Sequence, residues 1–328
     1  MDFAENRSHS NPNPRKPLPR LTTLPLICHD YCYIVVFTLI TLAIWRMPLL
    51  YSNERAVPLS MWNPAASFDN TGSSLRPPSD LSYQWKPEPL PSELCGVLVV
   101  IIPIVVVIVF QSRNFNVRDL HAGISGSLKA VVATAFVCTI LKQVVGGFRP
   151  HFVDVCRPDP KFIAEDMALG RYWFNATACS GDSYEVRRAM QSFPSGHAAN
   201  SFSSGTFITL YLNAKLKTFA DQSTFLPTLI LTIAPLLLAS LVSGSMYVSN
   251  QHHANDIVFG IIIGLLFGFS AYRSVYTAVF DFRLNHIPLP FARHAGLVHV
   301  HDPSQSGTQE AVGWDGAGLN KTSRAGKE

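Results

Sequence analysis

Long apolar runs separated by short polar segments dominate the chain between about residues 31 and 275. A membrane-spanning helix needs about 20 consecutive, mostly apolar residues. Six segments come close to that pattern: 31–50, 92–111, 119–141, 194–212, 225–246 and 256–275. Their apolar residues fall in blocks rather than in amphipathic stripes. The pattern therefore predicts an all-α, polytopic membrane protein with a bundle of six transmembrane helices.

Two of these segments contain polar residues that a lipid-facing helix would not tolerate. Lys129 lies near the middle of 119–141, so it must face the bundle or reach an interface. The segment 194–212 contains Asn200, Ser201, Ser203 and Ser204. Such residues are typical of helices that pack against other helices.

The composition agrees with a membrane protein and argues against a nucleic-acid partner. The chain is 48% hydrophobic and 15% charged, whereas soluble proteins have about 25% charged residues. Its formal net charge of +4 is modest, and most basic residues lie in short interhelical segments. A nucleic-acid surface would gather them on one face.

Basic residues in the short connections predict the orientation. Arg113 and Arg118 lie in 112–118, and Lys215 and Lys217 lie in 213–224. The positive-inside rule places these segments in the cytoplasm. Both tails then also lie in the cytoplasm. The regions that face the other side of the membrane are 51–91, 142–193 and 247–255.

This topology divides the chain into three regions and suggests one disulfide. We expect a Pro-rich cytoplasmic tail at 1–30, a membrane domain at 31–285 and a polar, largely disordered cytoplasmic tail at 286–328. Cys156 and Cys179 share one polar loop on the far side of the membrane. They are disulfide candidates if that side is oxidising.

Two polar clusters on that side suit an anion. The first, LKQVVGGFRP, contains Lys142 and Arg149, and its glycines and proline predict that the helix ends and a loop folds back. Two cations at a membrane boundary are also typical interfacial anchors. In the second, SFPSGHAAN, Ser195 and Gly196 begin a helix whose free N–H groups can bind an anion beside His197. A helix cap with an ordinary histidine is the alternative.

The third cluster, SMYVSNQHHAND, places His252 and Asp256 at i and i+4, where they share one helix face. A carboxylate bonded to one imidazole nitrogen fixes the tautomer and leaves the other nitrogen free as base or nucleophile. A metal site formed by His197, His252 and Asp256 is the rival hypothesis. Two cations nearby oppose it.

In order, K-x6-R-P, P-S-G-H and S-x6-H-x3-D form a specific signature. The chain resembles members of the type 2 phosphatidic acid phosphatase (PAP2) superfamily. Within it, the chain is similar to fungal lipid phosphate phosphatases that act on diacylglycerol pyrophosphate and phosphatidate. The resemblance covers about residues 31 to 275 and includes RPHFVDVCRPDP and SDLSYQWKPEPLP.

The resemblance implies a six-helix bundle of the PAP2/haloperoxidase-like type, with all three motifs on the lumenal, extracellular or vacuolar face. It implies a lipid phosphate in the bilayer as substrate, no cofactor and no metal, and it leaves the oligomeric state open. It implies that His252 is the nucleophile that forms a phosphohistidine, that Asp256 orients it and that His197 is the acid. The phosphate ligands that it implies are Lys142, Arg149, Ser195 and Gly196. Fixed cations and amides would stabilise the developing charge.

The chain departs from the family pattern at two positions. The third motif of the family begins Ser-Arg, where this chain has Ser245-Met246, and many relatives carry arginine where Gln251 stands. Methionine cannot donate a hydrogen bond or carry charge. An alternative function is therefore a catalytically impaired homologue that binds lipid phosphate or another membrane protein. A second alternative keeps the enzyme and changes the substrate to a sphingoid-base or isoprenoid phosphate.

Overall fold

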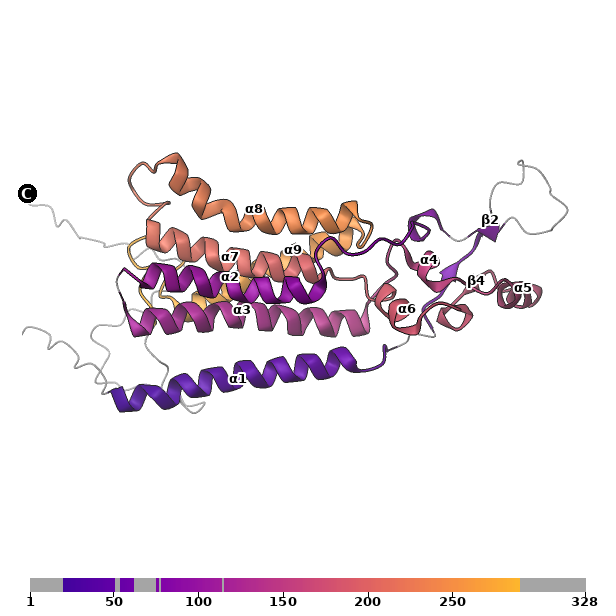
Figure 1. Cartoon of the computed structure of the whole chain (residues 1–328), viewed down its shortest axis with the longest axis horizontal. Coiled ribbons are helices and arrows are strands. Elements are labelled where there is room, and N and C mark those ends of the chain that lie inside the picture. The colour runs from indigo at the N-terminus through magenta and orange to yellow at the C-terminus, as the bar shows by residue number, and fades with distance from the viewer. Residues whose placement is uncertain (1–19, 51–53, 62–74, 77, 114, 290–328) are drawn as a thin grey trace, which may run out of the picture.

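A computed structural model describes residues 20–50, 54–61, 75–76, 78–113 and 115–289. Six long helices run side by side through the described chain (Figure 1). They are α1 (Arg20–Arg46), α2 (Ser92–Gln111), α3 (Val117–Val144), α7 (Gly196–Leu216), α8 (Leu226–Val248) and α9 (Ala254–Val275). The predicted all-α, polytopic membrane fold is confirmed.

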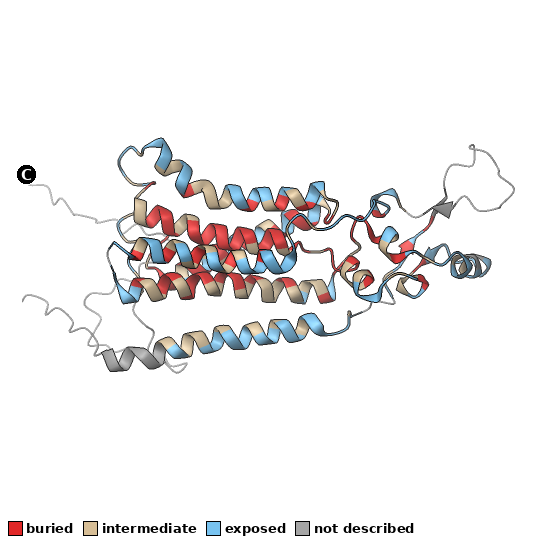
Figure 2. Ribbon diagram, viewed as in Figure 1, coloured by how far each residue is buried: buried red, intermediate tan, exposed pale blue. Residues whose placement is uncertain are grey.

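The number of spans needs a correction. Five helices of the described chain are long and apolar enough to cross a membrane, and α7 is not among them. The segment predicted as the fourth span does form a helix, but α7 packs against α2, α3, α8 and α9. Most of its residues are buried inside the bundle (Figure 2). Because its neighbours shield it from lipid, α7 can be more polar than the helices around it.

The serines of α7 are satisfied by neighbouring helices. Ser203 Oγ accepts a hydrogen bond of 2.9 Å from Thr134 Oγ1 of α3, and Ser204 Oγ donates one of 2.9 Å to Val99 O of α2. Buried polar groups that are paired in this way fix the orientation of a helix. The polar composition of the 194–212 segment therefore positions α7 among its neighbours.

Glycines let α9 approach α7 closely. An added Cβ at Gly260 would lie 2.7 Å from Ser195 O, and one at Gly268 would lie 2.6 Å from Ser203 O. Both separations are shorter than any real Cβ contact, so only glycine fits there. Small residues at a four-residue spacing are a common device for close packing of membrane helices. This contact brings the start of α9 next to the start of α7.

The peripheral helix α1 packs mainly against α3. Asp30 Oδ1 lies 2.7 Å from Lys129 Nζ, so the lysine in the third predicted span has a partner on α1. The helix begins at Arg20, eleven residues earlier than the expected span, and ends at Arg46 rather than at residue 50. Pro48 explains this end, because the residue before a proline is disfavoured in the α conformation.

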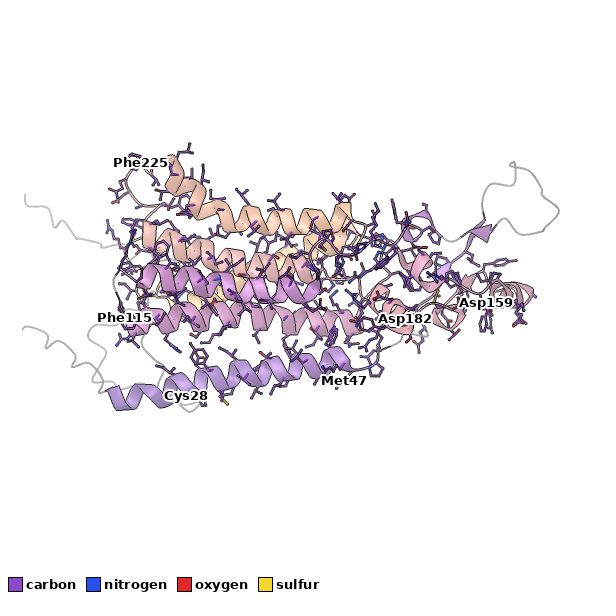
Figure 3. All side chains as sticks on the ribbon, in the orientation of Figure 1. Cys28, Met47, Phe115, Asp159, Asp182 and Phe225 are labelled. Atoms are coloured by element: carbon purple, nitrogen blue, oxygen red, sulfur yellow. A yellow bond between two sulfur atoms is a disulfide. The ribbon has the colours of Figure 1, made fainter. Side chains whose placement is uncertain are left out.

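A small cap covers one end of the bundle. It contains the following short elements: β1 (Val57–Pro58), β2 (Ser60–Met61), β3 (Leu75–Arg76), η1 (Ser79–Leu81), α4 (Phe152–Cys156), α5 (Pro160–Ala168), β4 (Trp173–Phe174), η2 (Ala176–Ala178) and α6 (Ser183–Ala189). Strand β1 pairs antiparallel with β4, and β2 with β3. Phe152, Phe174 and Met190 are buried in its core. Figure 3 labels Asp159 and Asp182 in this cap, and Phe115 and Phe225 at the opposite end of the bundle.

The disulfide predicted in the cap is confirmed. Cys156 and Cys179 are bonded, with Cα atoms 4.6 Å apart and a sequence separation of 23. A loop of that length is stabilised by about 3 kcal/mol on a chain-entropy estimate. The bond ties α4 to the segment after η2.

The start of α7, the end of α3, the end of α8 and the start of α9 all lie at the capped end (Figure 1). At the other end, residues after α9 fold back, because Leu289 N donates to Val275 O and Tyr272 Oη donates to Asn285 O. The two expected tails lie largely outside the described residues. Only residues 20–30 of the first tail and 286–289 of the second are described.

Candidate active site

The two cations of the first polar cluster meet because the chain turns back after α3. Gly146 and Gly147 have φ angles of 58° and 111°, which favour glycine. The loop that follows brings Arg149 beneath the cap, where its N–H donates to Ala189 O at 2.7 Å. Lys142, in the last turn of α3, donates from Nζ to Gln191 O at 2.6 Å. The predicted helix end and fold-back are as expected.

Arg149 is held on one side and has an unpaired nitrogen on the other. Its Nη1 donates to Glu88 Oε1 at 3.1 Å and to Gln251 Oε1 at 2.8 Å. The residue is 8% exposed. Its buried Nε has no hydrogen-bond partner among the described residues. A buried guanidinium N–H without a partner is costly, and an anion oxygen would satisfy it.

Glu88 is a residue of the site that the sequence did not single out. Its Oε1 also accepts a hydrogen bond of 2.8 Å from Arg188 Nη2. Burial by itself raises the pKa of the Glu88 carboxyl, but Arg149 and Arg188 outweigh it and lower the pKa to about 2. The carboxylate is therefore ionised and holds two guanidinium groups side by side. A single acid within a proline-rich loop gave no sequence signal for this role.

Neighbouring Arg187 and Arg188 point to different places. Arg187 Nη2 donates to Trp45 O at 2.6 Å, and also to Met47 O, at the end of α1. Arg188, in contrast, lines a cavity that Lys142 and Arg149 also line. Of the two arginines that could supply the charge missing at Met246, the geometry favours Arg188.

The second cluster begins α7 as predicted. Ser195 is its N-cap, with Oγ accepting from Ala198 N at 3.4 Å. This side chain is fully buried, and the residues that line the cavity in the described chain do not include it. Gly196 and His197 do line the cavity. His197 Nε2 lies 2.9 Å from Leu90 O, in the loop before α2.

The third cluster forms the turn between α8 and α9. His252 is 2% exposed, and its Nδ1 lies 3.7 Å from Asp256 Oδ2. That distance exceeds a hydrogen bond. Burial, with the positive charges of Arg149 and Lys142, lowers the pKa of His252 to about 3 although Asp256 favours its charged form. The imidazole is therefore neutral at neutral pH.

His253 has a different environment from its neighbour. It precedes α9, its N–H donates to Asp256 Oδ2 at 2.9 Å, and its Nδ1 lies 3.6 Å from the same oxygen. The contact with Asp256 raises the pKa of His253, although burial acts against it. This residue therefore orients Asp256 at the helix start.

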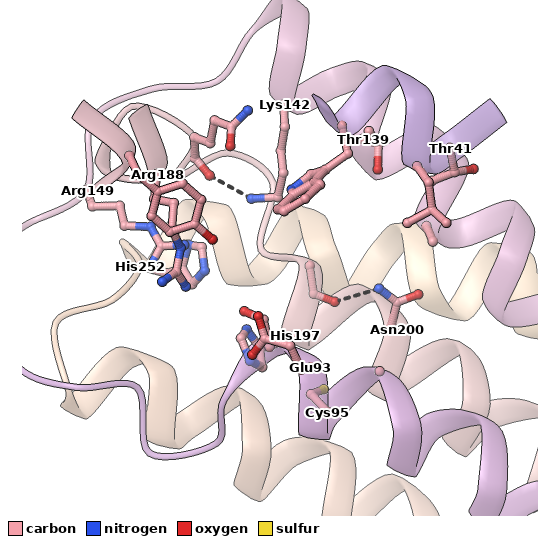
Figure 4. A pocket seen from close by; sticks show the side chains of 18 residues that line it. Thr41, Glu93, Cys95, Thr139, Lys142, Arg149, Arg188, His197, Asn200 and His252 are labelled. Atoms are coloured by element: carbon pink, nitrogen blue, oxygen red, sulfur yellow. Dashed lines mark hydrogen bonds between the residues drawn. The ribbon is translucent and has the colours of Figure 1, made fainter. Parts of the chain in front are cut away.

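A cavity of about 480 Å³ joins the three clusters (Figure 4). Its polar end is lined by side chains or backbone from each cluster and from α6: Lys142, Arg149, Arg188, Gly196, His197 and His252. From α1, α2 and α3 come an apolar wall and polar residues beside it. The apolar wall is formed by Leu42, Trp45, Cys95, Gly96 and Ala135, and the polar residues are Thr41, Ser92, Glu93 and Thr139. The arrangement can bind an anionic group beside two histidines and an apolar group towards the bilayer.

The two departures from the motif pattern have different structural settings. Met246 is fully buried near the end of α8, and it is not among the described residues that line the cavity. Gln251 accepts from Arg149 and donates from Nε2 to Lys86 O at 2.6 Å. An arginine side chain at 251 would offer no acceptor atom to Arg149 Nη1, and its positive charge would repel that of Arg149. Glutamine is therefore compatible with the observed position of Arg149.

The rival metal hypothesis gains no support from the geometry. No group of three or more His, Cys, Asp or Glu side chains in the described ranges could hold a metal ion. His197 and His252 face the same cavity, but Asp256 is not among its lining residues.

Comparisons with known proteins agree with the sequence signature. Residues 126–280 match the family model described as the PAP2 superfamily. Lipid phosphate phosphatase 1 of Arabidopsis thaliana is 37% identical over 60% of this chain and 58% of its own length. Lipid phosphate phosphatase 2 of the same plant is 30% identical over 74% of this chain and 79% of its own length.

A fungal relative also matches. The probable diacylglycerol pyrophosphate phosphatase 1 of Schizosaccharomyces pombe is 24% identical over 68% of this chain and 78% of its own length. No solved structure matches the chain. Because the family model covers all three motifs and a relative at 30% identity is covered over most of its length, the chain belongs to the PAP2 superfamily.

Proposed function

We propose that this protein is an integral-membrane lipid phosphate phosphatase that works through a phosphohistidine intermediate. The observation that carries the proposal is the cavity itself. Three segments far apart in the sequence place cations, a helix start and two histidines around one space, and α1, α2 and α3 add an apolar wall to its lining. The names of the relatives support a phosphatase that acts on lipids.

In this mechanism the phosphate binds at the polar end of the cavity. Lys142, Arg149, Arg188 and the amide of Gly196 surround its oxygens. Neutral His252 attacks phosphorus through Nε2, and the bond from phosphorus to the leaving oxygen breaks as the new bond forms. Burial lowers the pKa of His197, so the step uses the protonated imidazolium form, which the bound phosphate favours. It gives a proton from Nε2 to the leaving oxygen, for which Nε2 must leave Leu90 O, and becomes a neutral imidazole. Water then attacks the phosphohistidine and gives a proton to the neutral His197. The bond from phosphorus to His252 Nε2 breaks, and inorganic phosphate is released.

The substrates proposed are phosphomonoester or pyrophosphate lipids: phosphatidate, lysophosphatidate and diacylglycerol pyrophosphate. The apolar wall supports an acyl chain. Leu42 and Trp45 come from α1, and Gly96 comes from α2. Both helices have exposed, apolar outer faces. A lipid could therefore reach the cavity from the bilayer between these helices. Sphingoid-base and isoprenoid phosphates would fit the same wall.

The proposed orientation places the site on the lumenal, extracellular or vacuolar face. The capped end carries the disulfide and the sequon at Asn175. The connections with Arg113 and Lys215 lie at the other end of the bundle, which the positive-inside rule assigns to the cytoplasm. Proteolysis of sealed vesicles tests this. Cleavage between residues 157 and 175 from the cytoplasmic side would contradict it.

The function is tested by phosphate release from phosphatidate and diacylglycerol pyrophosphate in mixed micelles, with and without EDTA. We expect turnover that persists in EDTA and is abolished in His252→Ala. His286→Ala is the matched control, because His286 lies at the far end of the bundle near Lys217. Turnover that survives in His252→Ala, or that EDTA removes and magnesium restores, would refute the mechanism.

A second candidate function follows from the buried Met246, which stands where the family pattern has arginine. Because the cation at position 246 is missing from the third motif, a site whose charge comes from α6 instead could bind a lipid phosphate without hydrolysing it. Absence of phosphate release, together with retention of the protein on phosphatidate vesicles that is lost in Arg149→Ala, would favour this binding homologue over the enzyme.

A further inference from the structure

Ser192 is a buried polar residue at the start of the second cluster, two residues before its P-S-G-H motif. It is 1% exposed. Its backbone N–H donates to Gly147 O at 3.0 Å, so the segment before α7 is fixed against the turn that follows α3. The side chain then points towards the start of α9, where the third motif lies.

The Ser192 hydroxyl lies between the two residues that the motif pattern pairs directly. Its Oγ donates to Asp256 Oδ2 at 2.6 Å and lies 3.4 Å from His252 Nδ1. The direct separation of Asp256 Oδ2 and His252 Nδ1 is longer, at 3.7 Å. The serine is therefore the nearer partner of the imidazole.

The direction of these bonds decides the tautomer of His252. A serine hydroxyl has one proton, and in this geometry that proton is donated to Asp256. Ser192 Oγ can then only accept, so the proton in the second bond belongs to His252 Nδ1. A neutral imidazole with Nδ1 protonated has its lone pair on Nε2. That is the nitrogen which a nucleophile in the cavity needs.

We propose that Ser192 is a positioning residue that connects Asp256 to His252 and holds the imidazole in the tautomer with a free Nε2. The inference rests on the proposed function, in which His252 is the nucleophile. It replaces the direct carboxylate–histidine pair with an Asp256–Ser192–His252 chain. Ser192 acts through His252 and does not touch the substrate.

The first test compares turnover of phosphatidate by the parent, Ser192→Ala and Ser192→Thr. For metal-binding histidines, loss of the outer hydrogen-bond partner typically costs about 10- to 100-fold in activity, and we take the same range for His252. We expect that fall in kcat for the alanine variant, with KM nearly unchanged and most of kcat restored by threonine. Ser203→Ala is the control, since Ser203 is a buried serine of α7 bonded to Thr134. Full activity of Ser192→Ala, or equal losses in alanine and threonine, would overturn the inference.

The second test needs no turnover and separates this inference from the proposed function. Nitrogen-15 NMR of histidine-labelled protein reports which imidazole nitrogen is protonated, and His252→Gln identifies the signal. We expect one tautomer, protonated on Nδ1, in the parent and a shift towards the Nε2-protonated form in Ser192→Ala. A parent protonated on Nε2, or an unchanged tautomer in the variant, would contradict the role of Ser192. If the parent shows no phosphatase activity, the proposed function fails and this measurement alone decides.

Discussion

At the scale of single residues, the site differs from the motif pattern in how it places positive charge. Arg149 and Arg188 share the carboxylate of Glu88, and both line the cavity. Met246 is buried in α8 instead. The second guanidinium of the proposed phosphate site therefore comes from α6.

Replacing Arg188 by alanine should lower kcat/KM for phosphatidate strongly. Removing one partner of a desolvated charge pair costs about 2–5 kcal/mol, which is a loss of at least about 30-fold at 1.4 kcal/mol per factor of ten. Arg187→Ala is the matched control because Arg187 donates to carbonyls at the end of α1. Equal effects of the two substitutions would show that Arg188 does not bind the phosphate.

Placing the family arginine at position 246 should not rescue activity. The Met246 side chain is fully buried, and an unpaired buried charge costs several kcal/mol. We expect Met246→Arg to reduce the yield of folded protein, while the size-conserving Met246→Leu should be tolerated. Size-exclusion profiles in detergent and phosphate release check both. A well-folded Met246→Arg with higher kcat/KM would mean instead that the site had merely lost a ligand.

At the scale of the elements, the cavity depends on helices that approach from different directions. Glycines of α9 allow the starts of α7 and α9 to meet, so His197 and His252 face one space. Helices α1, α2 and α3 form the apolar wall. The proposed entrance for lipid is therefore a property of α1 and α2, which the motifs do not include.

A bulky side chain at Gly96 should distinguish lipid from soluble substrates. An added Cβ there meets nothing within 4 Å, and Gly96 lines the cavity, so Gly96→Phe can fill the wall without a clash at Cβ. We expect kcat/KM for phosphatidate to fall at least about tenfold, or 1.4 kcal/mol, while hydrolysis of p-nitrophenyl phosphate is retained. Both activities are measured on the same preparation.

Gly244→Phe provides the control for that substitution. Gly244 of α8 is also exposed and free of contacts at Cβ, and it lies outside the cavity lining. Its variant should hydrolyse both substrates normally. If Gly96→Phe and Gly244→Phe lower lipid hydrolysis equally, entry between α1 and α2 is wrong.

At the scale of the whole molecule, the pattern of hydrophobic blocks predicted all six long helices of the bundle, whereas only five of them are apolar enough to count as membrane spans. Five predicted spans are apolar because they face lipid, and α7 fails that criterion because other helices surround it. The three motifs led to Lys142, Arg149, His197 and His252, which line one cavity in the structure. Glu88 and Ser192 stayed hidden, because a lone acid and a lone serine gain meaning only when folding brings them to distant partners.

Acid should destabilise the folded protein through its buried site. Burial lowers the pKa of His252 to about 3 in the folded protein, from about 6.5 in the unfolded chain. The stability it contributes is therefore present above pH 6.5 and is lost as pH falls towards 3. Glu88, with a pKa of about 2 when folded, loses its contribution between about 4.5 and 2. We expect a lower Tm in detergent at pH 4.5 than at pH 7.5.

A double substitution isolates the histidines in that measurement. Burial also lowers the pKa of His151, to about 4, so His151→Gln/His252→Gln should reduce the change in Tm between pH 7.5 and 4.5. An undiminished change in the double variant would place the acid sensitivity elsewhere in the chain.

The central claim is that His252 forms a covalent bond to phosphorus, and trapping that intermediate tests it most directly. The protein is mixed with phosphatidate carrying phosphorus-32, quenched in alkali within milliseconds and digested for mass spectrometry. We predict a base-stable, acid-labile phosphate on His252, which is absent from His252→Ala. Hydrolysis by a folded parent with no labelled histidine, or with the label on His197 or His253, would contradict the mechanism.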